Sequence, residues 1–152
     1  MNKAAFFDRD GTINVNIGHL YDPKKLEFIP GRPDMIKKYN DEGYIVIVIT
    51  NQAGIAKGMY TVEDMNRLHE HMNQQLMAHW GAHIDAFYYC PHHPDYTGFC
   101  HCRKPGTGMI EQAIQDFNVD VAQSVLFGDK HSDIEAGQKC GIKSILLDEW
   151  VK

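Results

Sequence analysis

The sequence predicts an α/β protein in which helices cover both faces of a parallel sheet. Short apolar segments of strand length alternate along the chain with longer segments whose apolar residues recur at helical spacing. Residues 44–49 form a continuous, largely β-branched apolar run, which is typical of a strand buried on both faces. Because strands that alternate with helices pair in parallel, these observations favour a Rossmann-like three-layer sandwich.

Five segments have the length and composition of strands: Ala4–Phe7, 44–49, 84–89, 124–127 and 143–147. In parallel sheets of this kind, ligands bind at the carboxyl ends of the strands. Polar residues follow the first, second and fourth of these segments, so we expect them to meet in one crevice. They are Asp8-Arg9-Asp10, Thr50-Asn51-Gln52 and Gly128-Asp129.

Four segments between the strands predict helices. The first covers 33–41 and begins with proline, which suits a first helical turn. The second follows a possible capping box at Thr61–Asp64 and stops at Gly81. The third covers 109–117, and the fourth follows a second possible capping box at Ser132–Glu135 and ends near Gly141. Most histidines form no recognisable ligand set and are expected at the surface.

Length and charge limit the possible functions. The 152 residues are enough for one domain, 1–152. A net charge of −5 argues against a nucleic-acid or membrane-surface partner, because either would need a basic face. The sequence contains neither an apolar run of 18 residues nor a signal-peptide pattern, so we expect a cytoplasmic protein.

Two carboxylates follow the first strand in the segment Asp8-Arg-Asp-Gly-Thr12. Carboxylates this close are costly unless a cation neutralises them, and Mg²⁺ prefers carboxylate and phosphate oxygens. An acidic solvated loop is the alternative. A calcium-binding EF-hand is excluded, because its sixth and twelfth positions hold Ile13 and His19 instead of glycine and glutamate.

Three cysteines, Cys90, Cys100 and Cys102, fall within thirteen residues. In a reducing compartment such a cluster indicates metal binding rather than disulfides. One histidine would complete a Cys₃His set, the usual composition of a closed structural zinc site. Spacing alone does not choose among His92, His93 and His101, and free thiols in a loop remain the alternative.

Four motifs occur in the order D-x-D-G-T, T-N, K-P and G-D-x-x-x-D. In this order the whole chain resembles the haloacid dehalogenase (HAD) superfamily of phosphohydrolases. No gap between the motifs could hold a separate cap domain. The resemblance therefore implies a capless HAD fold and a monomer, with loops 13–29, 53–60 and 91–103 enclosing the substrate.

The resemblance also implies roles for individual residues. Asp8 would attack phosphorus and Asp10 would act as general acid and base, while Asp133 would support the lysine or a metal-bound water. Mg²⁺ would be held by Asp8, the backbone carbonyl of Asp10 and Asp129. Thr50 and Asn51 would bind phosphoryl oxygens and Lys104 would neutralise charge.

Within the superfamily, D-R-D-G-T together with C-x-H-x₇-C-x-C-R-K-P resembles two related branches. One comprises heptose 1,7-bisphosphate phosphatases, on the pathway to nucleotide-activated heptose, and the other histidinol-phosphate phosphatases. The same pattern selects His92 as the fourth zinc ligand, and the first branch fits better. The implied contacts to a phosphorylated sugar are Asn16, His19, Thr50, Asn51, Gln52, Arg103, Lys104 and Lys130. Lys57 departs from the arginine that is expected at its position.

Other functions remain open on the sequence alone. A histidinol-phosphate or other small sugar-phosphate phosphatase would use the same scaffold, and a phosphotransferase is not excluded. A catalytically inactive, zinc-stabilised binding module is disfavoured, because all four of Asp8, Asp10, Lys104 and Asp129 are present.

Overall fold

The computed structural model describes residues 1–148 and 150. It contains one five-stranded sheet in the order β3-β2-β1-β4-β5, and every neighbouring pair is parallel. The predicted α/β class with a parallel sheet is therefore confirmed. The strands are β1 (Ala4–Phe7), β2 (Ile45–Asn51), β3 (Ala86–Cys90), β4 (Val125–Gly128) and β5 (Lys143–Leu146).

Three strands, β2, β3 and β4, extend further toward the site than the sequence predicted. The parallel ladder between β2 and β3 continues through the pairs Thr50↔Tyr89 and Asn51↔Cys90. Thr50 and Asn51 are therefore the last residues of β2 instead of the first residues after it. Their positions are fixed by the sheet, which gives a ligand site a rigid wall.

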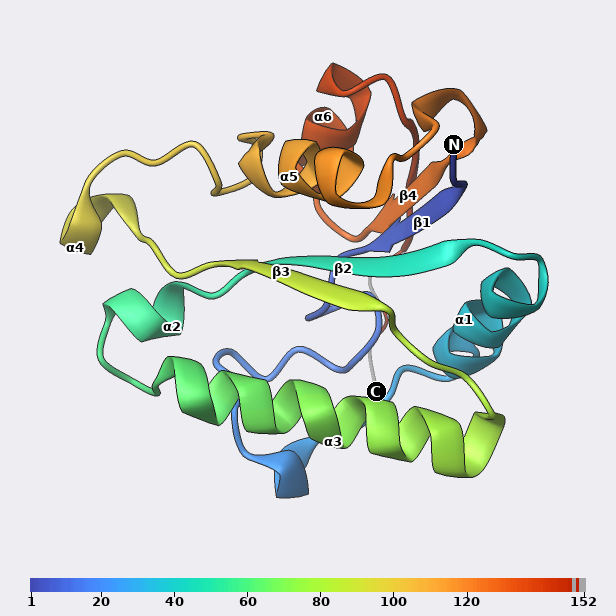
Figure 1. Ribbon diagram of the computed structural model, residues 1–152. Helices are drawn as coiled ribbons and strands as arrows, with labels where there is room; N and C mark the ends of the chain where they lie inside the picture. The colour runs from blue at the N-terminus through green and yellow to red at the C-terminus, as the bar shows by residue number, and fades with distance from the viewer. Residues whose placement is uncertain (149, 151–152) are drawn as a thin grey trace.

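Helices lie on both faces of the sheet and give the predicted three layers. In Figure 1, α1 and α3 lie on one side of the strands, and α5 and α6 lie on the other. The helices are α1 (Arg32–Asp41), α2 (Ala53–Ala56), α3 (Val62–Trp80), α4 (Pro94–Thr97), α5 (Gly108–Phe117) and α6 (His131–Lys139), with 3₁₀ turns η1 (Pro23–Lys25) and η2 (Val121–Gln123). No helix in the described part of the chain is both long and apolar enough to span a membrane.

The two ends of α3 follow the prediction. The Thr61 hydroxyl accepts the Asp64 N–H at 3.1 Å, and the Asp64 carboxylate accepts the Thr61 N–H at 3.0 Å, so the capping box forms. The helix ends at Gly81, whose φ of 64° is readily adopted by glycine.

The predicted capping box of α6 is wrong in register. The helix begins at His131 with Lys130 as its N-cap, so Ser132 lies inside the first turn. The acidic partner is Asp133, which accepts the Lys130 N–H at 3.2 Å, rather than Glu135. The Ser132–Glu135 pattern is present, but the helix begins two residues earlier, and Asp133 is the carboxylate that caps it.

The core consists of two apolar layers, one on each face of the sheet. Phe6 packs in the layer with α5 and α6, whereas Phe7 packs in the layer with α1 and α3. Both side chains are fully buried. Full burial of each stabilises the fold by roughly 1.5–3 kcal/mol. This alternation is typical of a strand that is covered on both faces.

The order of the strands determines where a site can form. β1 lies at the centre; the chain adds β2 and β3 on one side of it and then β4 and β5 on the other. The carboxyl ends of β1 and β4 therefore flank a topological switch point, where open α/β sheets bind ligands. Within residues 1–148, the segments between the ends of β1 or β2 and the next long helix contain η1, α2 and isolated β-bridges, which is too little structure for an inserted cap domain.

Candidate active site

Three carboxylates gather at the carboxyl ends of β1 and β4. The ligand oxygens of Asp8, Asp129 and Asp133 all lie within 4.8 Å of one another. Burial raises the pKa of Asp8 to about 6; nearby Lys104 opposes this rise and the neighbouring Asp129 adds to it. Concentrated negative charge away from water is unfavourable without a cation. The oxygen-only donor set fits a hard divalent ion such as Mg²⁺.

Lys104 provides the protein's own cation at this site. Its Nζ lies 2.7 Å from Asp8 Oδ1 and 2.6 Å from Asp133 Oδ1, and it donates to the Ile49 carbonyl at 3.0 Å. Burial acts to lower the pKa of Lys104, but the two carboxylates together raise it above its ordinary value. The lysine is therefore charged, and Asp133 both holds it and caps α6.

Gly11 allows the β1 loop to approach Asp129 closely. A Cβ at this position would lie 2.2 Å from Asp129 Oδ2, and its φ of 87° is a conformation that favours glycine. Thr12 lies between Asp8 and Asp129: its hydroxyl is 3.5 Å from Asp8 Oδ2 and 3.4 Å from Asp129 Oδ1. The D-x-D-G-T motif thus forms a compact turn against the end of β4.

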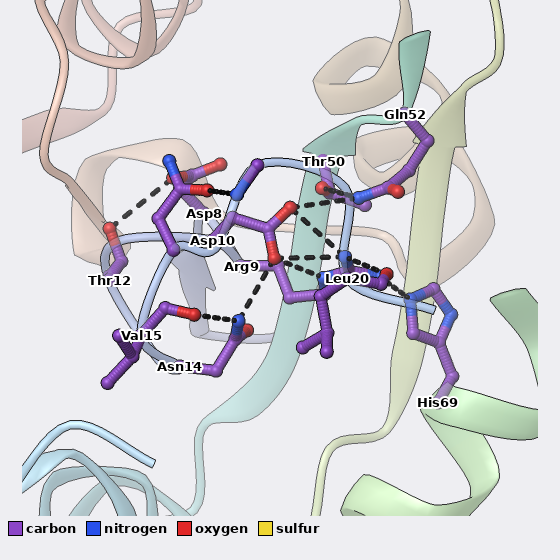
Figure 2. Close-up of polar contacts among 12 residues, drawn as sticks. Asp8, Arg9, Asp10, Thr12, Asn14, Val15, Leu20, Thr50, Gln52 and His69 are labelled. Carbon is purple, nitrogen blue, oxygen red and sulfur yellow. Dashed lines mark hydrogen bonds and ion pairs between the residues drawn. The ribbon is translucent and has the colours of Figure 1, made fainter. Parts of the chain in front are cut away.

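The carboxylate of Asp10 has different partners from that of Asp8. Figure 2 shows it among donors from Arg9, Asn14 and Gln52. Arg9 Nε donates to Oδ1 at 2.9 Å and Arg9 Nη2 to Oδ2 at 3.0 Å. Asn14 adds a bond of 3.0 Å to Oδ1 and Gln52 one of 3.3 Å to Oδ2. The two acidic residues of the motif therefore occupy separate environments suited to separate roles.

A cavity of about 230 Å³ opens beside these residues. Its lining includes Asp8, Asp10 and Lys104 together with residues from each of the three loops expected to enclose a substrate. All eight residues expected to contact substrate line this one cavity: Asn16, His19, Thr50, Asn51, Gln52, Arg103, Lys104 and Lys130. Its polar lining, with four cationic side chains including Lys57, suits a ligand that carries several negative charges.

The cysteine cluster lies between β3 and the loop that carries Arg103-Lys104. The side chains of Cys90, His92, Cys100 and Cys102 bring one ligand atom each to within 4.8 Å of the others. His92 Nδ1 lies 3.5 Å from Cys90 Sγ and 3.2 Å from Cys102 Sγ. Cys100 Sγ lies 3.6 Å from Cys90 Sγ and 3.8 Å from Cys102 Sγ. Three sulfurs and one imidazole nitrogen around a common point form a donor set that fits Zn²⁺.

The structure also pairs Cys90 and Cys102 as a disulfide, which differs from the expectation of metal binding without disulfides. A disulfide would remove two thiolates from the donor set. It gives no reason for the convergence of His92 and Cys100 on the same point, whereas a bound metal would draw all four groups together. The convergence of all four groups therefore favours zinc over a disulfide between Cys90 and Cys102.

Comparison with known proteins adds independent information. Residues 101–149 match the HAD-hydrolase-like family model. D-glycero-beta-D-manno-heptose-1,7-bisphosphate 7-phosphatase of Haemophilus ducreyi is 41% identical over 149 residues, covering 95% of this chain and 82% of that protein. D-glycero-alpha-D-manno-heptose-1,7-bisphosphate 7-phosphatase of Photorhabdus laumondii is also 41% identical, covering 95% and 81%. This chain belongs to the heptose-1,7-bisphosphate 7-phosphatase family of the HAD superfamily.

The fold of a heptose-bisphosphatase agrees with that of this chain. The crystal structure of D,D-heptose 1,7-bisphosphate phosphatase from B. bronchiseptica superposes with a TM-score of 0.87 at 32% identity, covering 95% of this chain and 79% of that one. That structure is complexed with magnesium and phosphate. The HAD fold expected from the order of the motifs is therefore confirmed.

Two residues in or beside this cavity, Tyr60 and His69, were not identified from the sequence. The Tyr60 hydroxyl donates to Gln52 Oε1, and Gln52 Nε2 donates to the Thr50 hydroxyl at 2.7 Å. His69, expected at the surface with most histidines, is 5% exposed and contacts Arg9. The position of His69 beside Leu68 and one turn from Met65 and Met72, on the apolar face of α3, was the available signal.

Proposed function

We propose that this protein is a Mg²⁺-dependent phosphatase that removes the C7 phosphate of D-glycero-D-manno-heptose 1,7-bisphosphate through an aspartyl-phosphate on Asp8. One observation carries the proposal: a buried Asp8, bound at 2.7 Å by Lys104, faces a cavity whose other walls carry additional cations. A bisphosphate needs charge compensation both at the reacting phosphate and at a remote one. Membership of the heptose-bisphosphatase family supports this choice of substrate.

The carboxylates of Asp8 and Asp129 and the backbone carbonyl of Asp10 are the groups that would hold Mg²⁺. When bound, the ion supplies positive charge to the phosphoryl oxygens and to the acidic cluster. Lys104 supplies a second positive charge at Asp8. Asp133 keeps the lysine ammonium in place at 2.6 Å.

The reaction proceeds in two displacements at phosphorus. In the first, an Asp8 oxygen forms a bond to phosphorus while the bond to the sugar oxygen breaks, and protonated Asp10 donates its proton to that oxygen. In the second, the Asp10 carboxylate takes a proton from water as the water oxygen attacks phosphorus. The bond to Asp8 then breaks, releasing inorganic phosphate and the free carboxylate.

The remaining cavity residues position the substrate. Thr50 and Asn51, fixed at the end of β2, would contact phosphoryl oxygens. Arg103 and Lys130 are the cationic groups suited to the remote phosphate or to sugar oxygens. The other expected contacts are Asn16, His19 and Gln52.

Substrate comparison tests this proposal. We expect wild-type protein to release phosphate from heptose 1,7-bisphosphate much faster than from histidinol phosphate, with Mg²⁺ and not with EDTA. Both anomers belong in the assay, because relatives named for each are equally similar to this chain. A preference for histidinol phosphate would keep the mechanism and overturn the substrate, and no release from any phosphate ester would favour an inactive binding module.

We further propose that Cys90, His92, Cys100 and Cys102 hold a structural Zn²⁺. The segment from Pro94 to Phe99 is exposed throughout and has little apolar burial of its own to order it. A metal at its base would fix the loop that leads into Arg103 and Lys104. Binding energy at such sites acts as folding energy.

Replacing Cys100 by serine should release this zinc. We expect about one zinc per chain in wild-type protein purified under reducing conditions and a loss of at least about 2 kcal/mol of unfolding free energy in Cys100→Ser. Cys140→Ser, at a free cysteine outside the cluster, is the matched control and should retain the metal. Metal analysis combined with thiol titration decides the question, since zinc-free protein lacking thiols at Cys90 and Cys102 would establish the disulfide instead.

A net charge of −5 argues against a broadly basic surface for nucleic acid or for anionic lipid. We also propose that the protein is a monomeric cytoplasmic enzyme and that residues 1–152 form one domain. Size-exclusion chromatography with light scattering tests the oligomeric state.

A further inference from the structure

Arg9 is the largest fully buried side chain among the described residues, and it lies inside the motif that carries the two acidic residues. Its guanidinium donates hydrogen bonds from Nε and Nη2 to the Asp10 carboxylate, and Nη2 also donates to the Leu20 carbonyl at 3.1 Å. Nη1 lies 3.1 Å from His69 Nε2. A charge buried to this degree requires fixed partners on every side.

The pair between Arg9 and His69 defines the state of the histidine. Arginine carries only donors, so Nε2 of His69 must be the acceptor and the ring proton must lie on Nδ1. A protonated imidazole would have no lone pair for this bond and would place two cations 3.1 Å apart. Burial lowers the pKa of His69 to about 3, with a further contribution from Arg9, in agreement with a neutral ring.

The histidine ring is itself held in one plane. It stacks on Phe87 of β3 with 4.0 Å between ring centroids and 8° between the planes. In Figure 2 the His69 ring faces Arg9, and the stack on Phe87 holds the ring in that orientation. The contacts therefore run in sequence from the sheet and α3, through His69 and Arg9, to the carboxylate of Asp10.

We propose that His69 is a positioning residue for the general acid–base, acting through Arg9 on the carboxylate of Asp10. The inference rests on the proposed function, in which Asp10 protonates the leaving oxygen. A carboxylate held by a two-pronged guanidinium has its plane fixed, and proton transfer requires that orientation. Loss of the Nε2 acceptor would leave one Nη1 donor unpaired and allow the guanidinium to rotate.

Leaving-group dependence separates positioning from a purely structural role. An alkyl phosphate expels a strongly basic alkoxide and needs a well-placed acid, whereas p-nitrophenyl phosphate expels a weakly basic phenolate and needs little help. His69→Phe keeps an aromatic ring to stack on Phe87 but removes the acceptor. His69→Gln offers an amide oxygen that can accept from Arg9.

We expect His69→Phe to slow single-turnover cleavage of an alkyl phosphate by about 10-fold or more, as part of the 10²–10⁴-fold that general acid–base catalysis contributes. Nitrophenol release should change by less than about 3-fold, with KM for the alkyl ester unaltered. His69→Gln should recover most of the alkyl activity. His79→Phe, the same change at an exposed position of α3, is the matched control and should behave as wild type.

The outcomes distinguish this inference from the proposed function. Heptose-bisphosphate turnover by wild-type protein tests the function, while the ratio of alkyl to aryl cleavage tests the positioning role on any alkyl phosphate that wild-type protein accepts. Equal loss on both esters, or no loss on either, would overturn the inference. Should His69→Phe fail to fold, Arg9→Lys, which keeps the charge but loses the planar fork, must show the same alkyl-specific loss or the inference is wrong.

Discussion

Replacement of Asp8 by asparagine is expected to reduce phosphate release by roughly 10⁴-fold or more while the protein remains folded. The amide oxygen is a poor nucleophile and cannot form the aspartyl-phosphate. The change is nearly isosteric, and it removes a charge from a buried carboxylate whose pKa burial already raises to about 6. Steady-state phosphate release measures the loss of activity, and thermal unfolding shows whether the variant remains folded.

An exposed aspartate provides the control for this variant. Asp34→Asn in α1 makes the same chemical change at an exposed position and should leave activity within about 2-fold of wild type. If Asp8→Asn kept more than a few per cent of wild-type activity, Asp8 would not be the nucleophile. Water attacking the substrate directly would then replace covalent catalysis.

Replacement of Lys104 by methionine should affect both stability and activity. The ammonium is the partner of two buried carboxylates, Asp8 at 2.7 Å and Asp133 at 2.6 Å, and its side chain is 2% exposed. Breaking a buried pair of this kind costs about 3–5 kcal/mol because it leaves the remaining charges uncompensated. Catalysis should fall by roughly 10²–10³-fold, the usual effect of removing one group that stabilises transition-state charge.

Denaturant unfolding of metal-free Lys104→Met measures the stability effect. Lys139→Met is the matched control, because Lys139 is half exposed and its 3.5 Å pair with Glu135 contributes less than about 0.5 kcal/mol. Excess Mg²⁺ should restore part of the lost stability in Lys104→Met by binding the acidic cluster. A loss below about 1 kcal/mol without metal would show that the carboxylates do not depend on the lysine.

The motifs at strand ends could be predicted because each is local in sequence and the parallel sheet brings its strand ends together. The same reasoning succeeded for α3, where Thr61 and Gly81 carry strong start and stop signals. The residues that the motifs identified as substrate contacts all line one cavity.

The features that sequence reasoning missed depend on distant contacts or on competing patterns. The bond between Arg9 and His69 joins residues sixty positions apart, and a polar side chain on an apolar helix face does not reveal its partner. At α6, two acidic residues were available to cap the helix, and the structure uses Asp133, whose carboxylate also binds Lys104, a contact that the local pattern does not reveal.

The most direct test of the central claim is to trap the covalent intermediate. Wild-type protein is mixed with heptose 1,7-bisphosphate and Mg²⁺, quenched in acid within milliseconds, treated with borohydride and analysed by peptide mass spectrometry. An aspartyl-phosphate at residue 8 is reduced to homoserine, so we predict homoserine at that position and none in Asp8→Asn. Complete turnover of the substrate with residue 8 unchanged at every quench time, or modification of a different residue, would contradict the account.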